Sequence, residues 1–210
     1  LLADADALGS LGQNRRQAGW DVRRVPPVQL PLFAALAAPA LGEEPAPALP
    51  LLPPAEEVAA DYQTHRLSLK GHPMQFLRGH FAAQGVLDCA AINAAQDGAK
   101  VRAAGVVLIR QRPGKGNAVF ITIEDETGIV NALLWARDLE AQRRAVMAAR
   151  LMLIEGEVQR SKENVVHLMA RRVIDASAEL ARLSDSAPGT GSPARHPRNV
   201  RILPRSRDFH

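Results

Sequence analysis

The spacing of apolar positions changes near residue 100. In the first part of the chain, apolar residues recur three or four positions apart, which is the period of a helix with one buried face. From Val101 onward they alternate with polar residues, and β-branched residues become frequent, which favours strands. We therefore expect helices in the first half of the chain and a sheet in the second.

A proline-rich segment interrupts the helical part. Apolar spacing predicts helices over residues 1–24, 55–70 and 74–84, and another short element over 87–95. Residues 25–54 contain 9 of the 15 prolines, a density through which neither a helix nor a central strand can run. We interpret that segment as an extended linker.

Five strands and one helix are expected between residues 100 and 175. The helix lies between the third and fourth strands, at 136–149. The strands cover residues 101–111, 118–124, 129–135, 150–160 and 165–174. This order matches the five-stranded Greek-key OB barrel, and Gly105 and Gly156 fit the bends that a small barrel needs. The predicted fold class is thus α+β, mainly β, with an OB barrel preceded by short helices and a Pro-rich linker, and followed by a disordered basic tail.

Alternation also predicts which residues of the second and third strands face outward. Phe120 and Asn131 alternate with apolar neighbours that point inward, namely Val119, Ile121, Ile123, Val130, Ala132 and Leu134. An outward aromatic ring on the second strand of an OB barrel lies where bases stack. We expect Phe120 to stack on a base and Asn131 to bond a base edge. The alternative is that Phe120 and Trp135 pack under a neighbouring segment.

Cationic residues gather in the two loops that grip oligonucleotides in OB folds. Arg110, Arg112 and Lys115 lie at the first inter-strand loop, and Arg160 and Lys162 lie at the last. We expect these five side chains to contact phosphates without reading sequence. The alternative is that both loops are solvated charged turns.

The positive charge is concentrated in the second half of the chain. Residues 1–99 carry 7 basic and 10 acidic side chains, and residues 100–175 carry 13 and 9. Residues 184–210, which are rich in Ser, Pro, Gly and Arg, carry 5 and 2. This asymmetry indicates a polyanionic partner, most often nucleic acid. The tail has no apolar core of its own, so we expect it to be disordered.

Length and composition narrow the class of protein. The 210 residues are 47% apolar, enough for a core, but contain no apolar run that could span a membrane. The chain begins at Leu1 without a signal-peptide pattern, so we expect a soluble, cytoplasmic protein that is a piece of something longer. The single Cys89 excludes a disulfide framework and fits a reducing compartment.

No set of residues predicts an active site. Glu124, Asp125 and Glu126 precede Thr127 and Gly128, a composition typical of a hairpin turn rather than of a metal site. The six histidines lack metal-ligand spacing, and there is no P-loop and no dinucleotide-binding glycine pattern. We therefore assign no catalytic residue and no metal ligand to this chain.

The proline-rich linker contains an apolar cluster, Gln29-Leu30-Pro31-Leu32-Phe33. An apolar anchor in an extended segment can fill a groove on a partner. The pattern is similar to the peptide with which bacterial proteins bind the replication sliding clamp, so Gln29, Leu30, Leu32 and Phe33 are candidate clamp-binding residues. The alternative is that this segment packs on its own protein.

Together these segments resemble the C-terminal part of the bacterial error-prone DNA polymerases, the damage-inducible α-subunit homologues of family C. The resemblance extends over essentially the whole chain. It is carried by residues 5–24, by Asp61–Pro73 with its Ser-Leu-Lys-x-His-Pro run, by Val106–Gly114 with Phe120–Gly128, and by Pro204–His210.

The resemblance implies a DNA-directed DNA polymerase, a nucleotidyltransferase that copies damaged DNA with low fidelity in translesion synthesis and damage-induced mutagenesis. The magnesium-binding catalytic carboxylates of that family lie in a palm domain that has no counterpart here, so this segment would need no cofactor. The implied partners are single-stranded template DNA, the sliding clamp and accessory mutagenesis proteins, and no membrane. The implied parts are a remnant of a helix-hairpin-helix region (1–24), the linker (25–54), a helical connector (55–99), the OB domain (100–175) and the basic tail (176–210).

Two other functions remain open from the sequence. The barrel pattern also fits the anticodon-binding OB domain of an aminoacyl-tRNA synthetase, which predicts a catalytic core after the barrel. The chain could instead be a protein-interaction module, in which Gln29–Phe33 and the tail recruit partners and the OB face is covered.

Overall fold

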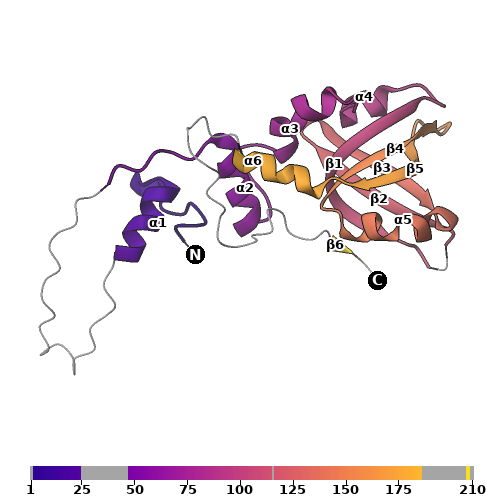
Figure 1. Cartoon of the computed structure of the whole chain (residues 1–210). Coiled ribbons are helices and arrows are strands. Elements are labelled where there is room, and N and C mark those ends of the chain that lie inside the picture. The colour runs from indigo at the N-terminus through magenta and orange to yellow at the C-terminus, as the bar shows by residue number, and fades with distance from the viewer. Residues whose placement is uncertain (1, 25–46, 115, 186–206, 209–210) are drawn as a thin grey trace, which may run out of the picture. The chain divides into compact units, whose positions relative to one another are not determined.

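A computed structural model describes residues 2–24, 47–114, 116–185 and 207–208 (Figure 1). The chain divides into two compact units, Leu1–Pro53 and Pro54–His210. The linker peptide Gln29–Phe33, the side chain of Lys115 and most of the basic tail lie outside the described residues.

The first unit contains less helix than the sequence predicts. A short 3-10 helix, η1 (Gly9–Leu11), is followed by α1 (Arg15–Arg24), where one helix was expected over residues 1–24. Gly12 ends η1 in the left-handed conformation, with a φ of 74°. The side chain of Asn14 then accepts a hydrogen bond of 2.9 Å from the backbone N–H of Gln17, which starts a new helix.

The second unit contains the barrel, in the predicted order. Its elements are β1 (Lys100–Gln111), β2 (Ala118–Asp125), β3 (Gly128–Trp135), α5 (Ala136–Ala148), β4 (Leu151–Arg160) and β5 (Val166–Asp175). The strands pair as β2-β3-β5-β4-β1, and a further β1–β2 pairing closes the barrel. A two-residue strand, β6 (Arg207–Asp208), adds a parallel pairing to β1. The five-stranded closed barrel, with its helix between β3 and β4, confirms the OB fold.

The inward-facing residues of β2 and β3 form the core of the barrel. Burial alternates strictly along both strands, and the six predicted inward residues are at most 6% exposed: Val119, Ile121, Ile123, Val130, Ala132 and Leu134. Each such burial stabilises the fold by about 1.5–3 kcal/mol for the larger side chains. The predicted register of these two strands is confirmed, and it fixes which residues face outward.

Two glycines permit strands to approach closely, as the sequence suggests. A Cβ atom on Gly105 would lie 2.6 Å from the carbonyl oxygen of Glu124 on β2. A Cβ atom on Gly156 would lie 2.4 Å from the carbonyl oxygen of Met169 on β5. The pairing of β4 with β5 shifts register next to Gly156, so this glycine lies at a bend of the barrel.

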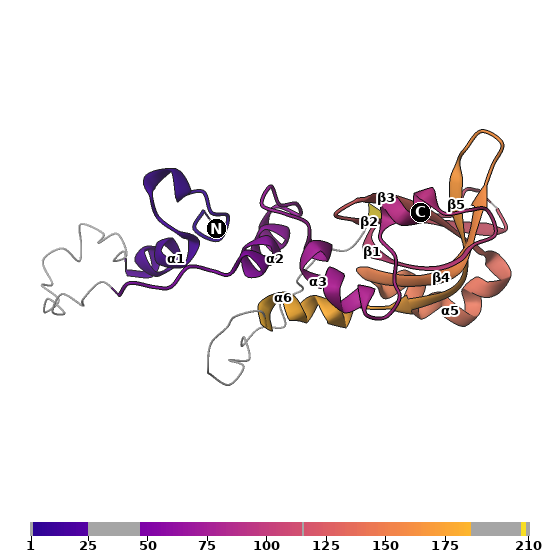
Figure 2. The same cartoon turned by 90° about the horizontal axis from the view of Figure 1, so that it is seen from above.

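Short helices cover the barrel at two places (Figures 1 and 2). One is α4 (Cys89–Ala94), whose Cys89 and Ile92 join the barrel core. The others form a group beside β1 and β4: α2 (Pro54–Thr64), α3 (Pro73–Ala82), η3 (Ser177–Ala181) and α6 (Arg182–Asp185). Met74, Leu77 and Phe81 of α3 form a second core with Leu180 and Leu183. The structure differs from the sequence prediction in this unit as well. The helix expected over 55–70 ends at Thr64, and the segment after residue 176 begins with a packed helical turn that the sequence did not predict.

Candidate nucleic-acid interface

The outer face of β1, β2 and β3 carries the residues predicted to bind bases. Strand register places Gln111, Phe120 and Leu133 side by side in one row across the three strands. The next row consists of Ile109, Thr122 and Asn131. Because directly paired residues project to the same side of a sheet, the register brings Phe120 and Asn131 onto one continuous face.

This face combines a partly exposed ring with hydrogen-bonding groups. Phe120 is half-buried and Asn131 is exposed. The Thr122 hydroxyl donates a hydrogen bond of 2.8 Å to Asn131 Oδ1, which orients the Asn131 amide and directs its Nδ2 group to other acceptors. The face can therefore stack on one base and donate a hydrogen bond to the edge of another.

Only part of the predicted first loop lies on the surface. Arg112 is exposed, and its Nε donates a hydrogen bond of 3.1 Å to the carbonyl oxygen of Gly116. Arg110, in contrast, is 5% exposed and donates a hydrogen bond to the carbonyl oxygen of Ala149. The reason is a register shift between Val107 and Ile109, which reverses the inward and outward positions along the end of β1. Arg110 is paired with the inward-facing Ile121 and does not reach the nucleic-acid face.

Arg160 of the last loop is bound to its own protein. Its Nη2 donates hydrogen bonds of 2.7 Å and 2.9 Å to the carbonyl oxygens of Asn93 and Ala95, at the end of α4. Its Nη1 donates to the side chain of Asn164. These bonds fix the loop to α4 and satisfy carbonyls at the helix C-terminus. Lys162, in the same loop, is exposed, and its contact with a phosphate stays a prediction.

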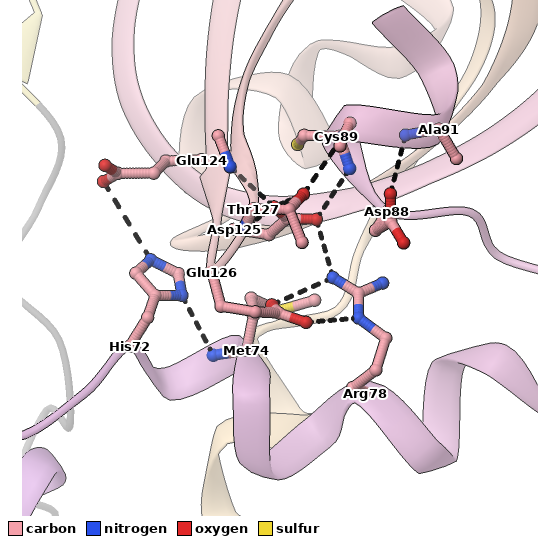
Figure 3. A network of polar contacts seen from close by, with 12 residues as sticks. His72, Met74, Arg78, Asp88, Cys89, Ala91, Glu124, Asp125, Glu126 and Thr127 are labelled. Atoms are coloured by element: carbon pink, nitrogen blue, oxygen red, sulfur yellow. Dashed lines mark hydrogen bonds and ion pairs between the residues drawn. The ribbon is translucent and has the colours of Figure 1, made fainter. Parts of the chain in front are cut away.

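The acidic turn between β2 and β3 holds α3 and α4 against the barrel (Figure 3). Arg78 of α3 donates hydrogen bonds of 2.6 Å from Nη2 to Asp125 Oδ2 and from Nε to Glu126 Oε1. The backbone N–H of Cys89, at the start of α4, donates to Asp125 Oδ2 at 2.8 Å. Thr127 donates to Asp125 Oδ1 through both its backbone N–H and its hydroxyl, at 2.7 and 2.6 Å.

These contacts set the charge state of Asp125. Burial acts to raise the pKa of its carboxyl, but the hydrogen bonds from Thr127 and Cys89 and the positive charge of Arg78 outweigh burial, so the pKa lies below its ordinary value. Burial raises the pKa of the neighbouring Glu124 carboxyl, and the negative charge of Asp125 adds to that rise. Burial also raises the pKa of the Cys89 thiol, which makes Cys89 the small buried residue expected from the sequence rather than a nucleophile.

His72 joins the same network from the start of α3. Its Nδ1 accepts a hydrogen bond of 3.1 Å from the backbone N–H of Met74, which caps the helix. Its Nε2 lies 3.9 Å from Glu124 Oε2 (Figure 3). Burial lowers the pKa of His72, although the negative charges of Glu126 and Asp125 oppose that change. Sequence reasoning missed the contacts of Arg78 and His72 with this turn, because Arg78 lies 47 and 48 residues from its partners along the chain and no local pattern marks such a pairing.

The three consecutive acidic residues, Glu124, Asp125 and Glu126, do not form a site for the magnesium ions that the resemblance to a polymerase implies. Asp125 and Glu126 are bound to Arg78 and to backbone N–H groups, so their oxygens are engaged. Within the described ranges, no three His, Cys, Asp or Glu side chains are grouped so that they could hold a metal ion. The same ranges contain no helix that is long and apolar enough to cross a membrane.

Comparison with known families and proteins agrees with this geometry. Residues 101–176 match the family described as OB-fold nucleic acid binding domain. The whole chain is similar to a segment of proteins named error-prone DNA polymerase. It is 53% identical, over 234 aligned positions, to the one from Bradyrhizobium sp. strain ORS 278, and 52% identical, over 216, to the one from Brucella abortus. The resemblance stated from the sequence is confirmed. The chain spans about a fifth of the length of these curated relatives, since 20% of each is covered.

Among solved structures, one similarity covers part of the chain. Asparaginyl-tRNA synthetase from Pyrococcus horikoshii is similar over 42% of this chain and 22% of its own, with 26% sequence identity and a TM-score of 0.37. The assignment of the OB fold rests on the closed barrel and on the family match.

Proposed function

We propose that this chain is the nucleic-acid-binding part of an error-prone DNA-directed DNA polymerase that acts in translesion synthesis and damage-induced mutagenesis, and that its barrel binds the single-stranded template. The similarity of the entire chain to error-prone polymerases supports the first part. Binding of the single-stranded template rests on one observation. Phe120 and Asn131 lie on the same outer face, in neighbouring rows of paired residues.

The preference for a single strand follows from the chemistry of this face. Stacking on Phe120 requires an exposed base, and a duplex keeps its bases stacked on one another. Every base has an aromatic face, so stacking discriminates little between sequences. Arg112 and Lys162, at the two loops, supply charges for the phosphates. A strand of any sequence therefore satisfies both requirements, as a template-copying enzyme needs.

The other functions considered from the sequence are less well supported. Both the tRNA-binding and the protein-interaction alternatives use the same fold, but the relatives that match the full chain are named DNA polymerases. Recruitment to the sliding clamp through Gln29, Leu30, Leu32 and Phe33 rests on the sequence pattern alone, since these residues lie outside the described ranges. The catalytic chemistry itself belongs, in this proposal, to the larger part of the polymerase that the chain does not include.

A competition titration tests the proposed function. The full chain is titrated with a labelled single strand and with the duplex of the same sequence, at one salt concentration. We expect tighter binding of the single strand, and little change when its base sequence is varied. Duplex binding that equals or exceeds single-strand binding would contradict the proposal.

The salt dependence of the same titration tests the loop cation. Replacing Arg112 by Ala should flatten the plot of log affinity against log salt by about 0.7, the value for one phosphate contact to a single strand. The matched control is Arg143→Ala, which removes the same charge from the exposed side of α5. Equal salt slopes for the two variants would show that Arg112 does not contact a phosphate.

A further inference from the structure

A cationic groove lies on the outer face of β1, β4 and β5, away from the face that carries Phe120. Its volume is about 740 Å³. Four cations line it, with Glu155 as the single carboxylate among its lining residues: Lys100, Arg102, Arg171 and Arg172. Glu157, which does not line the groove, contacts Arg171 from beside it. The four cations thus face two carboxylates, and the groove carries a surplus of positive charge.

Strand register explains why the cations converge. Arg102, Glu155 and Arg172 are direct neighbours across β1, β4 and β5, and both arginines share Glu155, at 3.2 Å and 3.9 Å. The register shift beside Gly156 leaves Arg171 without a directly paired residue on β4, and it lies 2.9 Å from Glu157. Arg171 and Arg172 remain largely exposed, at 73% and 68% of their side chains.

Gly156 lines the groove between these charges. The close approach of β5 excludes any side chain at this position, as a Cβ atom would lie 2.4 Å from the Met169 carbonyl oxygen. Gly156 is itself buried, so it shapes the bend of β4 beneath the groove and does not offer its backbone to a ligand. Among the residues that the structure describes, those lining the groove include no aromatic one, so its chemistry suits phosphates rather than bases.

The groove is continuous with the proposed single-strand face. Register places Phe120, Leu133, Met169 and Glu157 in one row around the barrel. A pocket of about 520 Å³ is lined by Trp135 and Met169 and shares Arg171 with the groove. Its lining also includes Arg137 and three carboxylates, those of Asp97, Asp138 and Glu157. Trp135 is 42% exposed. A strand that leaves Phe120 along this row passes Leu133 and Met169 and reaches Glu157. Arg171, 2.9 Å from Glu157, brings the cations of the groove to the end of this row.

We propose that a single strand bound at Phe120 continues past Leu133 and Met169 into this groove, where Arg171 and Arg172 bind its phosphates. The inference rests on the proposed function, because it extends the same strand around the barrel. It adds a length requirement, since only an oligonucleotide that extends beyond the first face can reach the groove. An acidic peptide would suit the charges as well, but it would not need the row of Phe120, Leu133 and Met169.

Oligonucleotide length separates this inference from the proposed function. The full chain is titrated with oligo(dT) of about 5 and about 15 nucleotides, near the two ends of the range of site sizes for OB folds. The test variant is Arg171→Ala/Arg172→Ala. The matched control is Arg143→Ala/Arg144→Ala, which removes two charges from exposed positions of α5. The ion pairs lost in the test variant are exposed, so the fold should be retained, and thermal unfolding checks this.

We expect the test variant to bind the short oligonucleotide like the unchanged chain. For the long one, its log-affinity against log-salt slope should be flatter by about 1.4, twice the single-contact value, and its affinity should be lower than that of the control. Arg171→Lys/Arg172→Lys should restore the slope, because phosphates need only the charge. An equal decrease in affinity and in salt slope for the two double alanine variants on the long oligonucleotide would contradict phosphate binding in the groove. That result would leave the proposal of binding at Phe120 intact. If the unchanged chain binds neither oligonucleotide, both proposals fail.

Discussion

Arg160 lies in a loop that binds oligonucleotides in other OB folds, but here its side chain stabilises the fold of its own protein. Its guanidinium donates to the carbonyl oxygens of Asn93 and Ala95 and to Asn164. The backbone N–H of Arg160 also donates a 2.8 Å hydrogen bond to the Asp97 carboxylate. Its bonds join the loop between β4 and β5 to residues more than 60 positions earlier in the chain.

Replacing Arg160 by Ala should therefore reduce stability rather than weaken phosphate binding. Hydrogen bonds made by a charged group are each worth about 1.5–3 kcal/mol, and we expect the free energy of unfolding to fall by about that amount. Urea unfolding measures the loss, and a single-strand titration at several salt concentrations should give an unchanged slope. A flatter slope at unchanged stability would assign Arg160 to the interface after all.

Residue types and alternation predict some positions of the site and not others. Phe120 and Asn131 could be placed on the outer face because β2 and β3 alternate without interruption. Arg110 could not be placed, because the register shift between Val107 and Ile109 leaves no mark in the alternation of β1. The partners of Arg160 were equally hidden, because they depend on which carbonyls the fold brings near.

At the scale of elements, Arg78 connects α3 to the turn between β2 and β3. The Asp125 side chain that it meets is fully buried, at 0% exposure, and Arg78 itself is 21% exposed. Removing one partner of such a pair leaves a charge buried without compensation. The ion pair between Arg78 and Asp125 is therefore a buried structural contact that holds α3 against the barrel.

Acid should weaken this connection. The pKa of Asp125 is lower in the folded chain than its ordinary value of 3.8. Such a carboxyl stabilises the fold fully above that ordinary value, and its contribution is lost as the pH falls through the lower, folded pKa. We expect the free energy of unfolding to decrease below about pH 4, and to decrease less in Asp125→Asn, which has no such proton to take up.

Denaturant unfolding at a series of pH values measures this difference. Arg78→Ala should lower the free energy of unfolding by about 3 kcal/mol at neutral pH, the order expected for one broken partner of a buried pair. Arg78→Lys keeps the charge but loses the geometry that lets one guanidinium bond two carboxylates. Its free energy of unfolding should therefore lie between those of the unchanged chain and of Arg78→Ala. An acid sensitivity that is identical in the unchanged chain and in Asp125→Asn would show that Asp125 does not contribute.

Elements differed in how well the sequence predicted them. All five barrel strands start and end within one residue of the predicted bounds, because alternation and the Gly-containing turns are local signals. The helix expected over residues 55–70 ends earlier, where Arg66 adopts a positive φ of 65°. The packed turn after residue 176 was missed because Leu180 and Leu183 become apolar contacts only once α2 and α3 are in place.

At the scale of the whole molecule, the helices and the nucleic-acid face occupy different parts of the second unit. The helices α2, α3 and α6 gather beside β1 and β4 (Figures 1 and 2), while Phe120, Thr122 and Asn131 stay on the outer surface of β2 and β3. The pairings of β3 with β5 and of β4 with β1 bring this face and the cationic groove onto adjoining strands of one sheet. That juxtaposition depends on pairings between distant strands, so no local sequence pattern could predict it.

The most direct test of single-strand binding by this face is a titration of one oligonucleotide against the Phe120→Ala variant at constant salt. Met147→Ala serves as the control, because Met147 is an exposed apolar residue of α5, 52% accessible, outside the proposed interface. Stacking is worth about 1–3 kcal/mol per base, so Phe120→Ala should weaken binding about ten-fold or more while thermal unfolding stays unchanged. Full affinity in the folded Phe120→Ala variant, or loss of the fold itself, would contradict the account.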